Sequence, residues 1–205
     1  MRRAKRETLG IVEGSREDKE SWSNFLRYLK ECRLKGVRGI SGKCNGLYEV
    51  LSDFFRDAKW QRCVVLWYRN VFNLCPWKHV REVAAMLKAI HTQEDKEAAR
   101  EKAALVAIKL RKLKPGKVAE SLEKSVEETL SHMGYPYEHW TRLRTNNGLE
   151  RIMKEIRRRT RIVGSFPDGY SAMMLVGARH RHISTTQWGT RQYMNTCKLY
   201  EECVM

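Results

Sequence analysis

Apolar residues in the last third of the chain follow a helical spacing. Four of them stand at positions i, i+3, i+4 and i+7: Leu149, Ile152, Met153 and Ile156. Residues with this spacing share one face of an α-helix, and most of the residues between them are charged. The pattern therefore predicts an amphipathic helix that buries its apolar face and ends near Gly164.

Three short apolar runs earlier in the chain predict β-strands, at Leu9–Val12, Val37–Ser41 and Trp60–Tyr68. Amphipathic patterns between these runs predict helices, so that strands and helices alternate. After Asn70 the apolar spacing is helical, and one part of this region is rich in alanine and charged residues. The pattern predicts an α-rich α/β fold with an all-helical block between residues 71 and 144.

The charge of the chain is strongly positive. Lysine and arginine exceed aspartate and glutamate by 16 in 205 residues, which favours a polyanionic partner, most simply a nucleic acid. No run approaches the ~18 apolar residues that a membrane-spanning helix needs. The basic N-terminus is not followed by the apolar segment of a secretory signal. We therefore expect no membrane partner.

The six cysteines are scattered and form no Cys-x-x-Cys pair: Cys32, Cys44, Cys63, Cys75, Cys197 and Cys203. His180 and His182 lack a nearby cysteine pair that would complete a zinc site. Scattered cysteines without a disulfide framework are typical of a reducing compartment. The sequence predicts a cytoplasmic protein without a structural zinc ion.

One line of the predicted C-terminal helix joins an acid to three cations: Glu150, Lys154, Arg157 and Arg161. Arg151 and Arg158 stand beside this line, and Arg159 is a further basic residue of the same helix. An acid among cations that bind phosphate indicates binding or chemistry on a nucleic-acid backbone. Two simpler interpretations stay open. Asn147 followed three residues later by Glu150 is also a capping-box pattern, and a basic helix face is often only solvated.

Large aromatic and sulfur-containing residues give a weaker signal. Four tryptophans favour burial in a core over base stacking, because large aromatic residues dominate cores: Trp60, Trp67, Trp77 and Trp140. Cys63 is expected to be buried in its strand.

Several stretches of the chain resemble the Mutator family of bacterial insertion-sequence transposases. The matching segments include Gly10–Gly14, Trp60–Val65, Arg144–Asn147 and Arg157–Gly164. The most specific of the similarities is the Asn-x-x-Glu-Arg pattern of residues 147–151, with the arginine cluster behind it.

The resemblance implies an RNase H-like α/β core that is interrupted by a helical insertion. Residues 1–70 are then a partial RNase H-like core, and residues 71–144 are the all-helical insertion. Residues 145–186 are C-terminal core helices that carry the acid and the basic cluster, and residues 187–205 form a loosely packed tail.

The family's activity is DNA transposition by metal-dependent strand cleavage and transfer. Two aspartates and one glutamate hold two divalent ions, usually Mg²⁺, which activate the nucleophile and stabilise the leaving oxygen. By resemblance Glu150 is the glutamate of this triad and a metal ligand. The second aspartate position is Gly42, and the first lies upstream of Gly10, where this chain begins too late to include it. A Cys-x-x-His motif of the family keeps Cys63 but has Leu66 at its histidine.

The resemblance thus implies a C-terminal part of a transposase with a degenerate active site, in which Glu150 lies close to Gly42. Its expected DNA contacts are the six cations of the helix: Arg151, Lys154, Arg157, Arg158, Arg159 and Arg161. The expected partners are insertion-sequence DNA ends and a second copy or a full-length related transposase. The alternative is a non-catalytic basic protein, derived from a transposase, that binds DNA or a partner.

Overall fold

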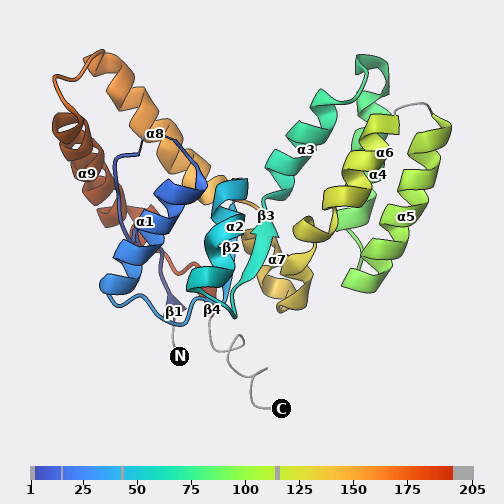
Figure 1. The fold of residues 1–205 in the computed structure, drawn as a ribbon, viewed down its shortest axis with the longest axis horizontal. Helices are drawn as coiled ribbons and strands as arrows, with labels where there is room; N and C mark the ends of the chain where they lie inside the picture. Colours follow the sequence, from blue (N-terminus) through green and yellow to red (C-terminus); the bar gives the residue numbers. More distant parts are fainter. Residues whose placement is uncertain (1–2, 15, 43, 114–115, 196–205) are drawn as a thin grey trace. The chain divides into compact units, whose positions relative to one another are not determined.

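The computed structural model describes residues 3–14, 16–42, 44–113 and 116–195. The fold divides into two compact units, each assembled from separate segments of the sequence. The first unit contains Met1–Val37, Cys44–Arg56 and Asn146–Met205, and the second contains Arg38–Lys43 and Asp57–Thr145. Helices dominate the described chain and its strands are short (Figure 1), which confirms an α-rich α/β class. The RNase H-like core stays a prediction.

Helices α1 (Lys19–Glu31) and α2 (Asn45–Phe54) pack together in the first unit. Helix α1 begins where the Asp18 carboxylate accepts a hydrogen bond from the Ser21 amide (2.9 Å). A Cβ atom at Gly46 would lie 2.8 Å from the carbonyl carbon of Asp18, so the close approach of the two helix starts requires glycine. The buried apolar residues of this pair are Leu26, Leu29, Leu47, Val50 and Leu51.

Helices α8 (Asn147–Val163) and α9 (Gly169–Thr185) form a second pair in the same unit. The Asp168 carboxylate caps α9 by accepting a hydrogen bond from the Ser171 amide (2.6 Å). The apolar cluster of this pair contains Ile152, Ile156 and Ile183. The predicted helix that carries Glu150 is therefore confirmed, and a second helix follows it.

The two ends of the described chain meet in this unit. After α10 (Gln187–Thr190), strand β4 (Met194–Asn195) pairs antiparallel with β1 (Arg3–Ala4). The guanidinium of Arg6 lies over the rings of Trp188 (5.0 Å) and Tyr193 (4.3 Å). Loose packing was expected for residues 187–205, but their described part, residues 187–195, makes these tertiary contacts. Cys197 and Cys203 lie outside the described residues.

The second unit contains a parallel pair of strands, β2 (Gly39–Gly42) and β3 (Lys59–Arg62). The register aligns Gly39 with Lys59 and Gly42 with Arg62, so both strands end at the same edge. A strand is therefore confirmed near each of the two predicted positions.

Helices and 3₁₀ turns form the rest of this unit (Figure 1). In chain order they are α3 (Val64–Asn73), η1 (Trp77–His79), α4 (Val80–His91), α5 (Lys96–Lys112), α6 (Gly116–Ser125), η2 (Glu127–Thr129), η3 (Ser131–Gly134) and α7 (Tyr137–Leu143). No strand occurs among the described residues of 71–144, so the predicted all-helical composition of this block is confirmed.

Two strand predictions need correction. Residues Leu9–Val12 form no strand; Leu9 and Val12 are exposed, and the segment contacts α1 instead of another strand, with Gly10 against the ring of Phe25. A strand needs a ladder partner, and α1 offers none.

The predicted strand Trp60–Tyr68 ends at Arg62, and helix α3 begins at Val64. Val64, Trp67 and Val71 are all buried and stand at i, i+3 and i+7. This helical spacing extends beyond the β-branched pair at residues 64 and 65 that favoured a strand, and tertiary packing overrides that local preference.

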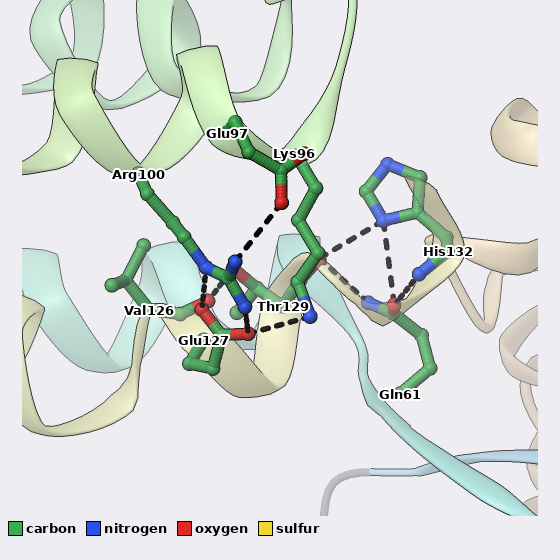
Figure 2. A network of polar contacts seen from close by, with 8 residues as sticks. All are labelled: Gln61, Lys96, Glu97, Arg100, Val126, Glu127, Thr129 and His132. Carbon is green, nitrogen blue, oxygen red and sulfur yellow. Dashed lines mark hydrogen bonds and ion pairs between the residues drawn. The ribbon is translucent and has the colours of Figure 1, made fainter. Parts of the chain in front are cut away.

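A buried polar network joins β3 to the turns η2 and η3 (Figure 2). The Gln61 side-chain amide donates to the Thr129 carbonyl oxygen (2.9 Å), and its Oε1 accepts from the His132 amide (2.6 Å). His132 Nδ1 also donates to the Thr129 carbonyl oxygen (2.9 Å). His91 Nε2 lies 2.8 Å from the Thr129 hydroxyl oxygen. These bonds satisfy polar groups that would otherwise destabilise the interior.

An exposed ion-pair cluster lies beside this network (Figure 2). The Glu127 carboxylate accepts hydrogen bonds from Arg100 (2.6 Å and 3.0 Å) and also pairs with Lys96. These hydrogen bonds, chiefly that from Arg100, lower the pKa of the Glu127 carboxyl to about 2. The cluster links the first turns of α5 to η2.

Candidate nucleic-acid interface

Helix α8 carries the predicted site and begins one residue earlier than the capping-box interpretation requires. Its N-cap is Asn146, whose side chain makes no capping hydrogen bond, and Asn147 is the first helical residue. A capping box needs its glutamate three residues after the N-cap, whereas Glu150 stands four residues after it. The capping-box interpretation of Glu150 is therefore wrong.

The apolar face of α8 is only half covered. Ile152 and Ile156 are buried, while Leu149 and Met153 are exposed. The predicted apolar face is therefore buried only in part, because only the two isoleucines belong to the apolar cluster formed with α9. The helix ends at Gly164, whose φ of 81° lies in the left-handed region that favours glycine.

Another line along α8 carries the predicted charges. Glu150, Lys154, Arg157 and Arg161 follow one another at helical spacing, and the three cations are exposed while Glu150 is half-buried. Arg151 is exposed next to this line. Within the described residues, none of these four cations forms an ion pair with a carboxylate. They keep their charge available for a ligand in solution.

Glu155 changes the role of the two remaining arginines. Its carboxylate pairs with Arg158 (2.9 Å), with Arg159 (3.8 Å) and with Arg179 of α9. Hydrogen bonds from Arg158 and then Arg179 lower the pKa of the Glu155 carboxyl to about 2. The charge of Arg158 and Arg159 is thus partly balanced inside the protein. The sequence held a signal for this, since Glu155 stands three and four residues before these arginines.

The aligned positions of the other family residues lie in the second unit. Gly42 is the last residue of β2, the place that the resemblance assigns to the second aspartate, and it is buried. Its carbonyl oxygen accepts a hydrogen bond from the Cys63 amide (3.0 Å). Cys63 is buried as expected, and it occupies the N-cap position of helix α3 instead of lying in a strand. Leu66 lies in the first turn of α3.

These residues do not fit a pair of divalent ions. Mg²⁺ binds oxygen ligands, and Gly42 has no side chain to supply one. Among the described residues, no three histidine, cysteine, aspartate or glutamate side chains lie close enough together to hold a metal ion. Glu150 belongs to the first unit and Gly42 to the second, and the closeness of the two stays a prediction.

Comparison with known proteins assigns the family. The family model of the Mutator transposases matches residues 2–189. The chain is 33% identical over 194 residues to the transposase for insertion sequence element IS256 in transposon Tn4001 from Staphylococcus aureus, covering 93% of this chain and 49% of that protein. It is 31% identical over 198 residues to the transposase for ISRM5 from Rhizobium meliloti, covering 96% and 50%.

A third relative is the transposase for IS1081 from Mycobacterium tuberculosis, 34% identical over 174 residues, with 84% of this chain and 42% of that protein covered. These matches assign the chain to a family in which the three relatives above are transposases of insertion sequences. The chain belongs to the Mutator family, and it spans about half the length of the curated relatives it matches. In the described part of the chain, no helix combines the length and apolar character needed to cross a membrane.

Proposed function

We propose that this chain binds DNA through helix α8 and neither cleaves nor joins it. The observation that carries the proposal is the line of exposed cations at Lys154, Arg157 and Arg161, with Arg151 beside it. These side chains have no carboxylate partner in the described part of the protein. The phosphate groups of DNA are suitable ligands for these cations, and arginine can bind one phosphate through two parallel hydrogen bonds.

The absence of catalysis rests on the chemistry of one position. Strand cleavage in this class of enzyme needs several carboxylate oxygens around two metal ions. Gly42 supplies none at the strand end where the family pattern has its second aspartate. With glycine at that position, Glu150 lacks the carboxylate that would share its metal ions.

The salt dependence of DNA affinity tests the interface. Each cation bound to phosphate contributes about −0.9 to the slope of log affinity against log salt concentration. Four contacts therefore give a slope of about −3.6 or steeper. The double substitution Arg157→Ala, Arg161→Ala is expected to flatten this slope by about 1.8 and to weaken binding equally on unrelated sequences. Fluorescence anisotropy with labelled duplexes over a range of salt concentrations measures both quantities.

The matched control removes two other charges from the same helix. Because Glu155 already pairs with Arg158 and Arg159, their double substitution by alanine is expected to change the slope by less than half as much. Melting temperatures establish that each variant is folded. Equal effects of the two double variants would contradict the assignment of the interface to the unpaired cations.

Strand transfer tests the proposed lack of catalysis. With Mg²⁺ or Mn²⁺ and a DNA end from a related insertion sequence, we expect neither nicked nor joined products on a sequencing gel. Metal-dependent nicking that is lost in Glu150→Gln would overturn this part of the proposal. It would mean that another acid, such as Asp53 or Asp57, replaces the missing ligand.

A second candidate function is binding to another transposase subunit. The exposed apolar residues of α8 and α9 favour it: Leu149, Met153, Tyr170 and Met174. Apolar residues gathered on neighbouring helices are a common feature of protein interfaces. Sedimentation of the chain alone and with a full-length relative distinguishes this function, because association without any DNA affinity would support it over the first.

A further inference from the structure

Trp77 is the most exposed large apolar residue of the described chain. Its relative exposure is 92%, whereas Trp67, ten residues earlier, is 1% exposed and lies in the core. Trp77 begins the turn η1, which follows the end of helix α3 and leads into α4 (Figure 1). The sequence-based expectation that this tryptophan is buried is therefore wrong. Packing of the core does not explain why this indole ring is present, because the ring is exposed to water.

The segment that leads to Trp77 and into α4 is basic as far as Arg81, and the next residue, Glu82, pairs with Lys109 of α5 (3.6 Å). From Ala58 to Arg81 the sequence contains no aspartate or glutamate, and it contains five cations: Lys59, Arg62, Arg69, Lys78 and Arg81. Arg62 pairs with Glu128, and Lys59 lies over the ring of Tyr135. Arg69, Lys78 and Arg81 are exposed, and the described residues offer them no ion-pair partner. Lys78 and Arg81 follow Trp77 by one and four residues.

An exposed indole beside unpaired cations favours a nucleic acid over an apolar protein surface as the ligand. An apolar protein surface that covered Trp77 would also remove Lys78 and Arg81 from water, which is unfavourable without a counter-charge. A nucleic acid can cover the indole and also supply counter-charges for the cations. A base can stack on the indole, and the adjoining phosphates can pair with the cations. Inside an uninterrupted duplex the bases are already stacked on one another, whereas an unpaired base can turn its face to the indole.

We propose that Trp77 stacks on an unpaired DNA base while Lys78 and Arg81 contact the adjoining phosphates. The proposal rests on the DNA binding proposed above and adds a preference for one form of DNA. The chain binds a duplex that carries unpaired bases at its end more tightly than a blunt duplex of the same sequence. Trp77 provides this difference, and the cations strengthen binding to both forms.

The test compares the full chain on a blunt duplex and on the same duplex with a short single-stranded overhang. Trp77→Ala is expected to weaken binding to the overhang duplex about tenfold and to leave binding to the blunt duplex unchanged. Trp77→Phe, which keeps an aromatic face, is expected to restore most of the loss. The double substitution Lys78→Ala, Arg81→Ala is expected to weaken both complexes alike and to flatten the salt dependence.

Tyr137→Ala is the matched control. Tyr137 is 77% exposed in the same unit and is followed by Glu138 instead of cations, so its loss is expected to leave both affinities unchanged. If the wild-type chain binds neither DNA, the proposed function fails. If it binds both DNAs and Trp77→Ala weakens neither or weakens both equally, only the stacking proposal is overturned.

Discussion

Replacing Trp67 by alanine is expected to lower the free energy of unfolding by about 4 kcal/mol, in the range measured for large-to-small substitutions in cores. Trp67 packs in the main apolar cluster of the second unit, together with residues of α4, α5, α6 and α7. Its indole N–H donates a hydrogen bond to Ser125 Oγ (2.7 Å), which links α3 to α6. The substitution therefore leaves a cavity and removes this hydrogen bond, while the Ser125 hydroxyl still donates to the Ser121 carbonyl oxygen (2.6 Å).

Urea unfolding followed by circular dichroism measures this effect. Trp77→Ala is the control, because the same change at an exposed position is expected to alter the free energy of unfolding by less than about 0.5 kcal/mol. Similar losses for the two variants would show that Trp67 does not lie in the core described above.

Acidification from pH 7 to pH 5 is expected to destabilise the protein strongly, because two buried histidines must stay neutral in the fold. His91 and His132 are buried, and their rings are stacked with centroids 6.5 Å apart. Burial lowers the pKa of each ring from 6.5 to about 4. The positive charge of Arg144 contributes to the lowering of both pKa values, and His132 contributes to that of His91.

The sign of the effect follows from proton binding. Below pH 6.5 the unfolded chain takes up a proton on each imidazole while the folded chain does not, so stability falls as the pH decreases. The loss grows until the pH reaches about 4, where the folded state also takes up the protons. At pH 5 it amounts to about 2 kcal/mol for each histidine.

Urea unfolding at a series of pH values between 7 and 5 measures this loss. His182→Gln is the control, because His182 is exposed and its removal is expected to keep the pH dependence of the wild type. His91→Gln is expected to make the dependence shallower, since one of the two buried rings is removed. A wild-type stability that stays constant from pH 7 to pH 5 would rule out two neutral buried histidines.

Helix α8 shows how much of the candidate site is encoded locally. Its helical period, its end at Gly164 and the alignment of Glu150 with three cations all follow from spacing along one chain segment, and the fold keeps them. Asp168 likewise caps α9 through a hydrogen bond from an amide only three residues ahead, which is a contact local in the sequence. The helical composition of residues 71–144 was also predictable, because strong helix formers and apolar spacing agree there.

Tertiary structure decided which of these side chains are available. The i,i+3 spacing indicates that Glu155 pairs with Arg158, but only the fold adds Arg179 of α9 to this ion-pair cluster. Leu149 and Met153 share the spacing of the buried isoleucines, yet α9 covers only part of that face. Exposure depends on the neighbouring helix, and a pattern along one helix holds no information about its neighbour.

Sequence by itself determined the family, the positive charge and most of the helices, because these depend on residue identity and on contacts a few positions apart. Only the tertiary structure decided that residues 64–68 are helical and that Leu9–Val12 has no strand partner. It also placed Trp67 in the core and Trp77 in solvent, although the two residues are identical in type and lie close together in the chain. The physical reason is that strand pairing and burial are set by segments distant in sequence, whose approach no local pattern records.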